Sequence, residues 1–262
     1  MTTVRKPLIA GNWKMNFDHL QALAFVQKIG WSLNDIKHDL ENVEIVIFPP
    51  FTDLRSVQTL VDADKLRIGY GAQDVSQHGP GAYTGEIAAE FLQKLGAQYV
   101  ITGHSERRSY HGESDELIGK KSAAALRQGI TPVICVGETA EDLEAHGAAA
   151  VPLQQVTAVL AELPENPEVV IAYEPVWAIG SGKAATAAQA QEVCGAIRQK
   201  ITELRGEAFG EKTRILYGGS VKSENIAEFM KQPDIDGALI GGASLKVEEF
   251  TKIAQFQKHI TV

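Results

Sequence analysis

The chain contains the stretch Val169-Val170-Ile171-Ala172-Tyr173-Glu174-Pro175, an unbroken apolar run that ends in a carboxylate and a proline. A run with no alternation of polar and apolar residues is typical of a parallel strand that is covered on both faces. Pro175 favours an extended backbone at Glu174. We therefore expect a buried strand here, with a fixed carboxylate at its carboxyl end.

Seven further apolar runs share this pattern, and amphipathic helical segments separate them. Examples of such segments are one that begins at Ser114, one that begins near Glu86, and one that begins at Thr186 with Gln189 three residues later as a capping box. The other expected strands are Leu8 to Asn12, Val43 to Phe48, Leu66 to Gly71, Tyr99 to Thr102, Pro132 to Val136, Arg214 to Tyr217 and Gly237 to Ile240.

Eight strand-and-helix units without a linker between them predict an α/β fold, a single (β/α)8 barrel domain over residues 1–262. An open doubly wound sheet is the alternative. It is less favoured because the first strand-to-helix turn has no GxGxxG motif, and because the candidate functional residues follow five different strands instead of one switch point.

The composition limits the classes of function. The 262 residues carry a net charge of −8 without a run of Lys or Arg, which argues against a nucleic-acid partner. No apolar stretch approaches the roughly 20 residues of a membrane span or resembles a signal peptide, so we expect a cytoplasmic protein without a membrane partner. Cys135 and Cys194 have no metal-site or CxxC spacing and are interpreted as buried thiols.

Three charged or titratable side chains follow expected strands: Lys14, His104 and Glu174. The carboxyl ends of parallel strands meet at one face of a barrel, so these side chains can converge on one small ligand. Glu174 is suited to act as a general base. Ser105 can begin a helical turn whose free N–H groups face the imidazole and favour a neutral His104, which could then donate a hydrogen bond from one ring N–H to a substrate oxygen.

Two glycine-rich turns predict a phosphate site. They are Tyr217-Gly218-Gly219-Ser220 after the seventh strand and Gly241-Gly242-Ala243-Ser244 after the eighth. Glycines let backbone N–H groups approach a ligand closely, and a short helical turn near Gly242 would add its positive end. No HxxxH or HExxH spacing indicates a metal site, and the remaining histidines are interpreted as structural: His19, His38, His78, His111, His146 and His259.

The segment after Glu174 combines bulky apolar residues with two glycines, as closing loops over active sites do. We expect a lid made of Val176, Trp177, Ala178, Ile179, Gly180, Ser181, Gly182 and Lys183.

Taken together, Asn12-Trp13-Lys14, residues 101–108, residues 172–180 and residues 217–221 resemble the triosephosphate isomerase family over nearly the whole chain. The resemblance implies a barrel enzyme that interconverts dihydroxyacetone phosphate and D-glyceraldehyde 3-phosphate in glycolysis and gluconeogenesis without a cofactor or metal. It also implies a homodimer in which the loop from Gln73 to Gly85 inserts beside Lys14 of the partner subunit.

The resemblance also implies a role for each matching residue. Glu174 would move the carbon-bound proton through an enediolate, His104 would polarise the carbonyl, and Lys14 with Asn12 would stabilise negative charge on oxygen. Glu106 would either form a structural ion pair with Lys14 or shuttle a proton. The backbone N–H groups that would bind the phosphate belong to Gly180, Ser220, Gly241 and Gly242.

Two other classes of function stay open from the residues alone. A Schiff-base aldolase on the same scaffold would need a desolvated lysine on the strand that instead ends at Glu174. A non-catalytic phosphate-binding or scaffold protein could keep the glycine turns, but it would have no need of Lys14, His104 and Glu174 together.

Overall fold

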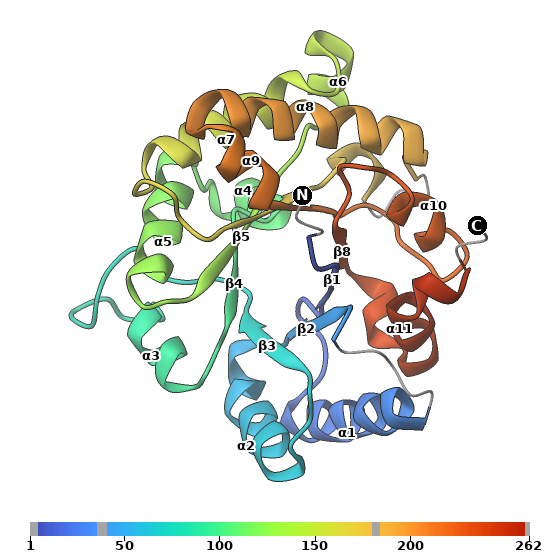
Figure 1. Cartoon of the computed structure of the whole chain (residues 1–262). Coiled ribbons are helices and arrows are strands. Elements are labelled where there is room, and N and C mark those ends of the chain that lie inside the picture. The colour runs from blue at the N-terminus through green and yellow to red at the C-terminus, as the bar shows by residue number, and fades with distance from the viewer. Residues whose placement is uncertain (1–4, 36–40, 180–183, 260–262) are drawn as a thin grey trace.

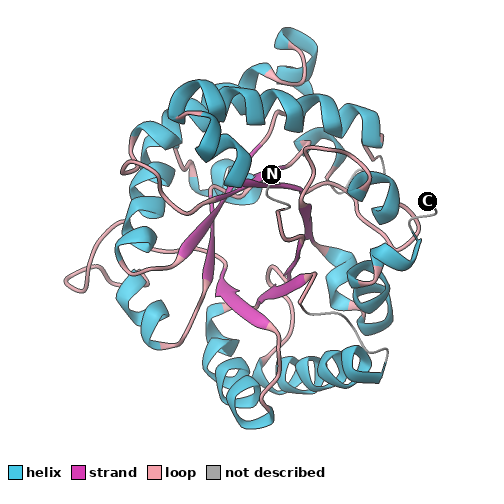
Figure 2. Ribbon diagram, viewed as in Figure 1, coloured by secondary structure: helices cyan, strands magenta, loops and turns pink. Residues whose placement is uncertain are grey.

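The computed structural model describes residues 5–35, 41–179 and 184–259. Eight parallel strands form a closed barrel in the order β1 to β8, with β1 paired to both β2 and β8. A ring of helices surrounds the strands (Figures 1 and 2). The strands are β1 Leu8–Asn12, β2 Glu44–Phe48, β3 Gly69–Ala72, β4 Tyr99–Thr102, β5 Thr131–Val136, β6 Val170–Tyr173, β7 Arg214–Tyr217 and β8 Gly237–Ile240.

The helices follow the strands along the chain, and most of them form the ring that covers the outer face of the barrel (Figure 1). They are α1 His19–Asp35, α2 Leu54–Asp64, α3 Ala89–Lys94, α4 Ser105–His111, α5 Asp115–Arg127, α6 Ala140–His146, α7 Ala150–Ala161, α8 Ala187–Arg205, α9 Glu207–Lys212, α10 Ile226–Met230 and α11 Val247–Ala254. Short 3-10 turns lie at η1 Phe51–Asp53, η2 Val176–Ala178, η3 Gly242–Leu245 and η4 Phe256–His259.

Both faces of each strand are buried, which explains why the strands carry no polar alternation. Along β1, Leu8 and Ala10 belong to the cluster that fills the barrel, whereas Ile9 packs in the layer between strands and helices. Cys135 lies in the inner cluster and Cys194 in the outer layer, and both are buried free thiols, as predicted.

The closed barrel confirms the predicted fold class, and the open-sheet alternative is wrong. Two predicted boundaries are also wrong. The third strand begins at Gly69 instead of Leu66, because the chain turns at Lys65 (φ 49°) and the Leu66 N–H bonds back to the end of α2 at Val61. The helix expected from Glu86 begins at Ala89, because the Ile87 carbonyl accepts a hydrogen bond from the Ser76 N–H instead of starting a helix.

The amino end of the barrel is held by three polar side chains at strand starts. Arg214 donates to the Glu44 carboxylate at 2.6 Å and to the Tyr99 hydroxyl at 2.7 Å, and Tyr99 donates to Glu44 at 2.7 Å. Burial, more than the neighbouring charges, raises the pKa of Tyr99 to about 12. This cluster ties β2, β4 and β7 together at the end of the barrel opposite the catalytic candidates.

Candidate active site

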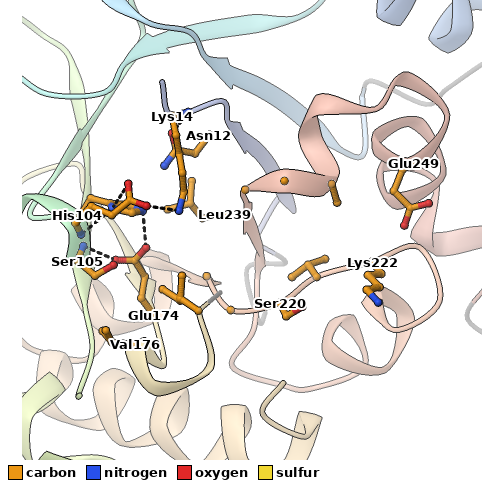
Figure 3. Close-up of a pocket in the computed structure, with 18 of the residues that line it drawn as sticks. Asn12, Lys14, His104, Ser105, Glu174, Val176, Ser220, Lys222, Leu239 and Glu249 are labelled. Atoms are coloured by element: carbon orange, nitrogen blue, oxygen red, sulfur yellow. Dashed lines mark hydrogen bonds and ion pairs between the residues drawn. The ribbon is translucent and has the colours of Figure 1, made fainter. Parts of the chain in front are cut away.

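A cavity of about 860 Å³ opens at the carboxyl ends of the strands. Its walls include Lys14, His104 and Glu174 on one side and the two glycine turns on the other (Figure 3). Segments from β1, β4, β6, β7 and β8 therefore meet in one space, as the placement of the candidates after these strands predicts.

Glu174 is buried at the end of β6 and both of its carboxylate oxygens have partners. Oε1 lies 2.9 Å from Nε2 of His104, and Oε2 accepts the Ser105 N–H at 3.0 Å. Burial, the largest influence, would raise the pKa of Glu174. The His104 ring, the Ser105 N–H and the Lys14 ammonium together outweigh it and lower this pKa, so the carboxyl group is ionised.

His104 is the residue that caps helix α4, which begins at Ser105 as expected. Its Nδ1 accepts the Glu106 N–H at 3.2 Å, so the ring proton lies on Nε2, facing Glu174. Burial would lower the pKa of His104, but the Glu174 carboxylate, followed by Glu106, raises it above the ordinary value. The hydrogen bond that Nδ1 accepts favours the neutral imidazole, whereas the contact with the Glu174 carboxylate favours the protonated imidazolium.

Lys14 reaches the cavity from a left-handed backbone conformation, with φ of 54°. Strand β1 ends at Asn12, as predicted, and the Asn12 side chain stabilises the turn by accepting the Lys14 N–H at 3.0 Å. The Lys14 ammonium lies 2.6 Å from the Glu106 carboxylate. Asn12, Lys14 and Glu106 therefore form one connected group, and the Glu106 carboxylate lies 3.6 Å from Nδ1 of His104. Figure 3 shows Asn12, Lys14 and His104 at this side of the cavity.

The glycine turns present backbone donors to the cavity. Within the described part of the chain, the N–H groups of Ser220, Gly241 and Gly242 have no hydrogen-bond acceptor. The short helical turn expected near Gly242 is η3. Unpaired amides next to a helical turn favour an anion. Gly180, the fourth predicted donor, lies outside the described residues.

The described part of the expected lid, residues 176–179, is bonded to a buried carboxylate. Glu138 accepts the Trp177 indole N–H at 2.7 Å and the Tyr173 hydroxyl at 2.9 Å, and its carbonyl accepts the Val176 N–H. Burial, the largest influence, raises the pKa of Glu138. Ser181, Gly182 and Lys183 lie outside the described residues.

Several residues of the site could not be recognised from the sequence. The sequence predicts that the Ser105 turn faces the imidazole, but it does not predict that the Ser105 N–H bonds the candidate base. Glu138, which follows β5 and holds Trp177, belongs to no recognisable motif. Lys222 and Glu249 line the phosphate side of the cavity. Glu249 lies in the first turn of α11, where an acidic residue normally indicates only a favourable helix start.

Nothing in the described ranges forms a group of three or more His, Cys, Asp or Glu side chains that could hold a metal ion. Across those same ranges, no helix has both the length and the apolar character needed to cross a membrane.

Comparison with known proteins agrees with the geometry of the site. The family model described as triosephosphate isomerase matches residues 7–257. The triosephosphate isomerase of Leifsonia xyli subsp. xyli is 62% identical over 256 residues, which cover 98% of this chain and 99% of that protein. That of Corynebacterium diphtheriae is 60% identical over 252 residues, covering 95% and 96%. That of Streptomyces avermitilis is 57% identical over 257 residues, covering 97% and 99%. The non-catalytic and aldolase alternatives find no support among these relatives. The chain belongs to the triosephosphate isomerase family.

Proposed function

We propose that this enzyme interconverts dihydroxyacetone phosphate and D-glyceraldehyde 3-phosphate, with Glu174 as the base. The observation that carries the assignment is the contact of 2.9 Å between the ionised Glu174 and His104 in the cavity that also holds the free amides of the glycine turns. One end of the substrate would lie at the charged side chains and its phosphate at the amides.

In the proposed reaction, Glu174 removes a proton from the carbon next to the carbonyl, and an enediolate forms. His104 donates its Nε2–H to the carbonyl oxygen, and Lys14 stabilises the negative charge there. Glu174 then returns the proton to the former carbonyl carbon, while the proton of the neighbouring hydroxyl passes by way of His104 to the former carbonyl oxygen, so that the carbonyl group now lies on the neighbouring carbon. Because the Nε2–H now faces Glu174, substrate binding must separate these two side chains before either can act.

The Lys14 neighbours have supporting roles in this proposal. Asn12 fixes the Lys14 turn through its side chain and faces the same cavity. Glu106 forms the ion pair that holds the Lys14 ammonium, and proton shuttling remains its alternative role. Gly180, Ser220, Gly241 and Gly242 are proposed to supply the N–H groups that bind the phosphate.

The proposed lid spans Val176 to Lys183. Its support is the attachment of residues 176–179 beside the base, where Val176 and Ile179 line the cavity. Closure of this segment over the substrate would exclude water from the enediolate.

We also propose a homodimer formed through the loop from Gln73 to Gly85, which projects away from the barrel between β3 and α3 (Figure 1). Residues 79–86 are exposed, and Gln73 at the base of the loop donates to the Lys14 carbonyl at 2.8 Å. Met15, beside Lys14, is 96% exposed, so a second copy could bury both surfaces. We expect the enzyme to work in the cytoplasm, where its triose phosphate substrates are metabolised.

The test is turnover of glyceraldehyde 3-phosphate by the purified protein in a coupled dehydrogenase assay, with light scattering for the mass. Glu174→Gln should lower kcat by roughly a hundredfold to ten-thousandfold, the usual contribution of a general base. Full turnover by this variant would refute the assignment of the base, and a monomeric mass with full activity would refute the dimer.

A further inference from the structure

The loop that follows β7 is stabilised from within by one asparagine. Asn225 donates from Nδ2 to the Ser220 carbonyl at 3.1 Å and accepts the Lys222 N–H at 2.8 Å. These bonds define the shape of the loop. They do not define its distance from the second glycine turn, which follows β8.

Glu249 joins this loop to the helix after β8. Its Oε1 accepts the Ser223 N–H at 2.7 Å, and its Oε2 accepts the Ser223 hydroxyl at 3.0 Å. In the portion of the chain that the structure describes, these two are the only hydrogen bonds between residues 218–225 and α11. Because η3, which holds Gly242, leads directly into α11, the bonds from Glu249 to Ser223 connect the two glycine turns.

A carboxylate in this position is electrostatically unfavourable for phosphate binding. Glu249 lines the same cavity as Ser220 and Gly242, and Figure 3 shows its side chain on the same side of the cavity as Ser220 and opposite Glu174. A negative charge there repels a dianion across the cavity. Its presence is understandable if the two bonds to Ser223 contribute more to the phosphate site than the repulsion removes.

We propose that Glu249 is a positioning residue for the phosphate site: by holding Ser223 with both carboxylate oxygens, it sets the spacing at which the N–H groups of Ser220 and Gly242 converge on one phosphate. Ser223 is its partner in this role. The inference rests on the proposed function, because it concerns the same phosphate.

If Glu249 sets the spacing of the two turns, its loss should change KM and kcat differently. Loss of the contact weakens phosphate binding in the ground state and the transition state alike, so KM rises while kcat is nearly unchanged. Glu174, His104 and Lys14 lie on the opposite side of the cavity and keep their bonds. A substrate without a phosphate, D-glyceraldehyde, should therefore react as before.

The experiment compares Glu249→Ala, Glu249→Gln and Ser223→Ala with the whole wild-type protein. Glu249→Ala should raise KM for glyceraldehyde 3-phosphate and the inhibition constant of inorganic phosphate by the same factor, about 3- to 10-fold, with kcat and the rate on D-glyceraldehyde within twofold of wild type. Glu249→Gln, which keeps one acceptor for the Ser223 N–H, should restore most of the affinity. Ser223→Ala removes only the hydroxyl bond and should give a smaller effect.

Glu248→Ala is the matched control, since Glu248 lies in the same first turn of α11 but is exposed and makes no described bond to the loop. It should leave both constants unchanged. The double variant Glu249→Ala with Ser223→Ala should be no worse than Glu249→Ala alone, because both changes remove one interaction.

Unchanged or tighter phosphate binding in a folded Glu249→Ala protein would overturn the inference, since the carboxylate would then act only by repulsion. Should Glu249→Ala fail to fold, Ser223→Ala decides the question, and an effect on kcat instead of KM would overturn it. Absence of turnover in wild type would instead refute the proposed function, so the two failures are distinguishable.

Discussion

The position of the Glu174 side chain can be tested by placing a methyl group behind it, through Gly218→Ala. A Cβ atom at residue 218 would lie 2.9 Å from Cγ of Glu174 and 3.2 Å from the Tyr173 carbonyl oxygen. Carbon atoms in contact are ordinarily about 3.5–4.0 Å apart. The Glu174 side chain must therefore shift by about 0.6–1.1 Å, the difference between these distances.

A shift of the Glu174 side chain disturbs its hydrogen bonds, because the carboxylate is bonded to His104 at 2.9 Å and to the Ser105 N–H at 3.0 Å. A misplacement of about 1 Å in a reacting group can cost roughly a hundredfold in rate. We expect Gly218→Ala to lower kcat by about 10- to 100-fold. Overpacking should also destabilise the protein by about 1–3 kcal/mol.

The assay is steady-state turnover of glyceraldehyde 3-phosphate, together with inhibition by inorganic phosphate and thermal unfolding. Gly195→Ala in α8 is a suitable control, because its new methyl group would meet only the ends of the Gln191 and Asp234 side chains. It should keep full activity. A folded Gly218→Ala variant with kcat within twofold of wild type would refute the reasoning, and an equal loss of phosphate affinity would show that the loop had moved instead of the base.

Three further predictions concern His104, the cluster of Arg214, Glu44 and Tyr99 at the amino end of the barrel, and the lid. The lowered pKa of Glu174 means that its ionised form stabilises the fold above the ordinary carboxyl pKa, and this stability is lost as pH falls through the lowered pKa. His104→Gln should remove the largest of the influences that lower the pKa of Glu174 against the effect of burial. Infrared titration should then find Glu174 protonated at higher pH than in wild type, and an unchanged titration would contradict this. Arg214→Met leaves Glu44 and Tyr99 without their cation, so urea unfolding should show a loss of about 2–4 kcal/mol while kcat stays within twofold; a large loss of kcat in folded protein would argue against a purely structural role. Glu138→Ala removes the acceptor of two buried donors, including the Trp177 indole, so stability should fall by about 1–3 kcal/mol per donor and tryptophan fluorescence should shift; unchanged fluorescence and stability would show that these bonds contribute little.

Much of the fold was predictable because parallel strands covered on both faces leave continuous apolar runs. The eight runs correspond to the eight strands, and the caps at Ser114 and Thr186 mark the starts of α5 and α8. The errors at Leu66 and Glu86 arose where a single long-range or turn hydrogen bond, invisible in a local pattern, decided the backbone.

The sequence by itself determined which side chains stand at strand ends, and hence that Lys14, His104 and Glu174 share one face of a barrel, because strand direction fixes where each carboxyl end lies. Only the tertiary structure decided their partners. The bonds from Ser105 to Glu174 and from Ser223 to Glu249 join segments far apart in the chain. Barrel closure sets their distances to within a hydrogen bond, and no periodicity or motif in the chain encodes a distance across the barrel mouth.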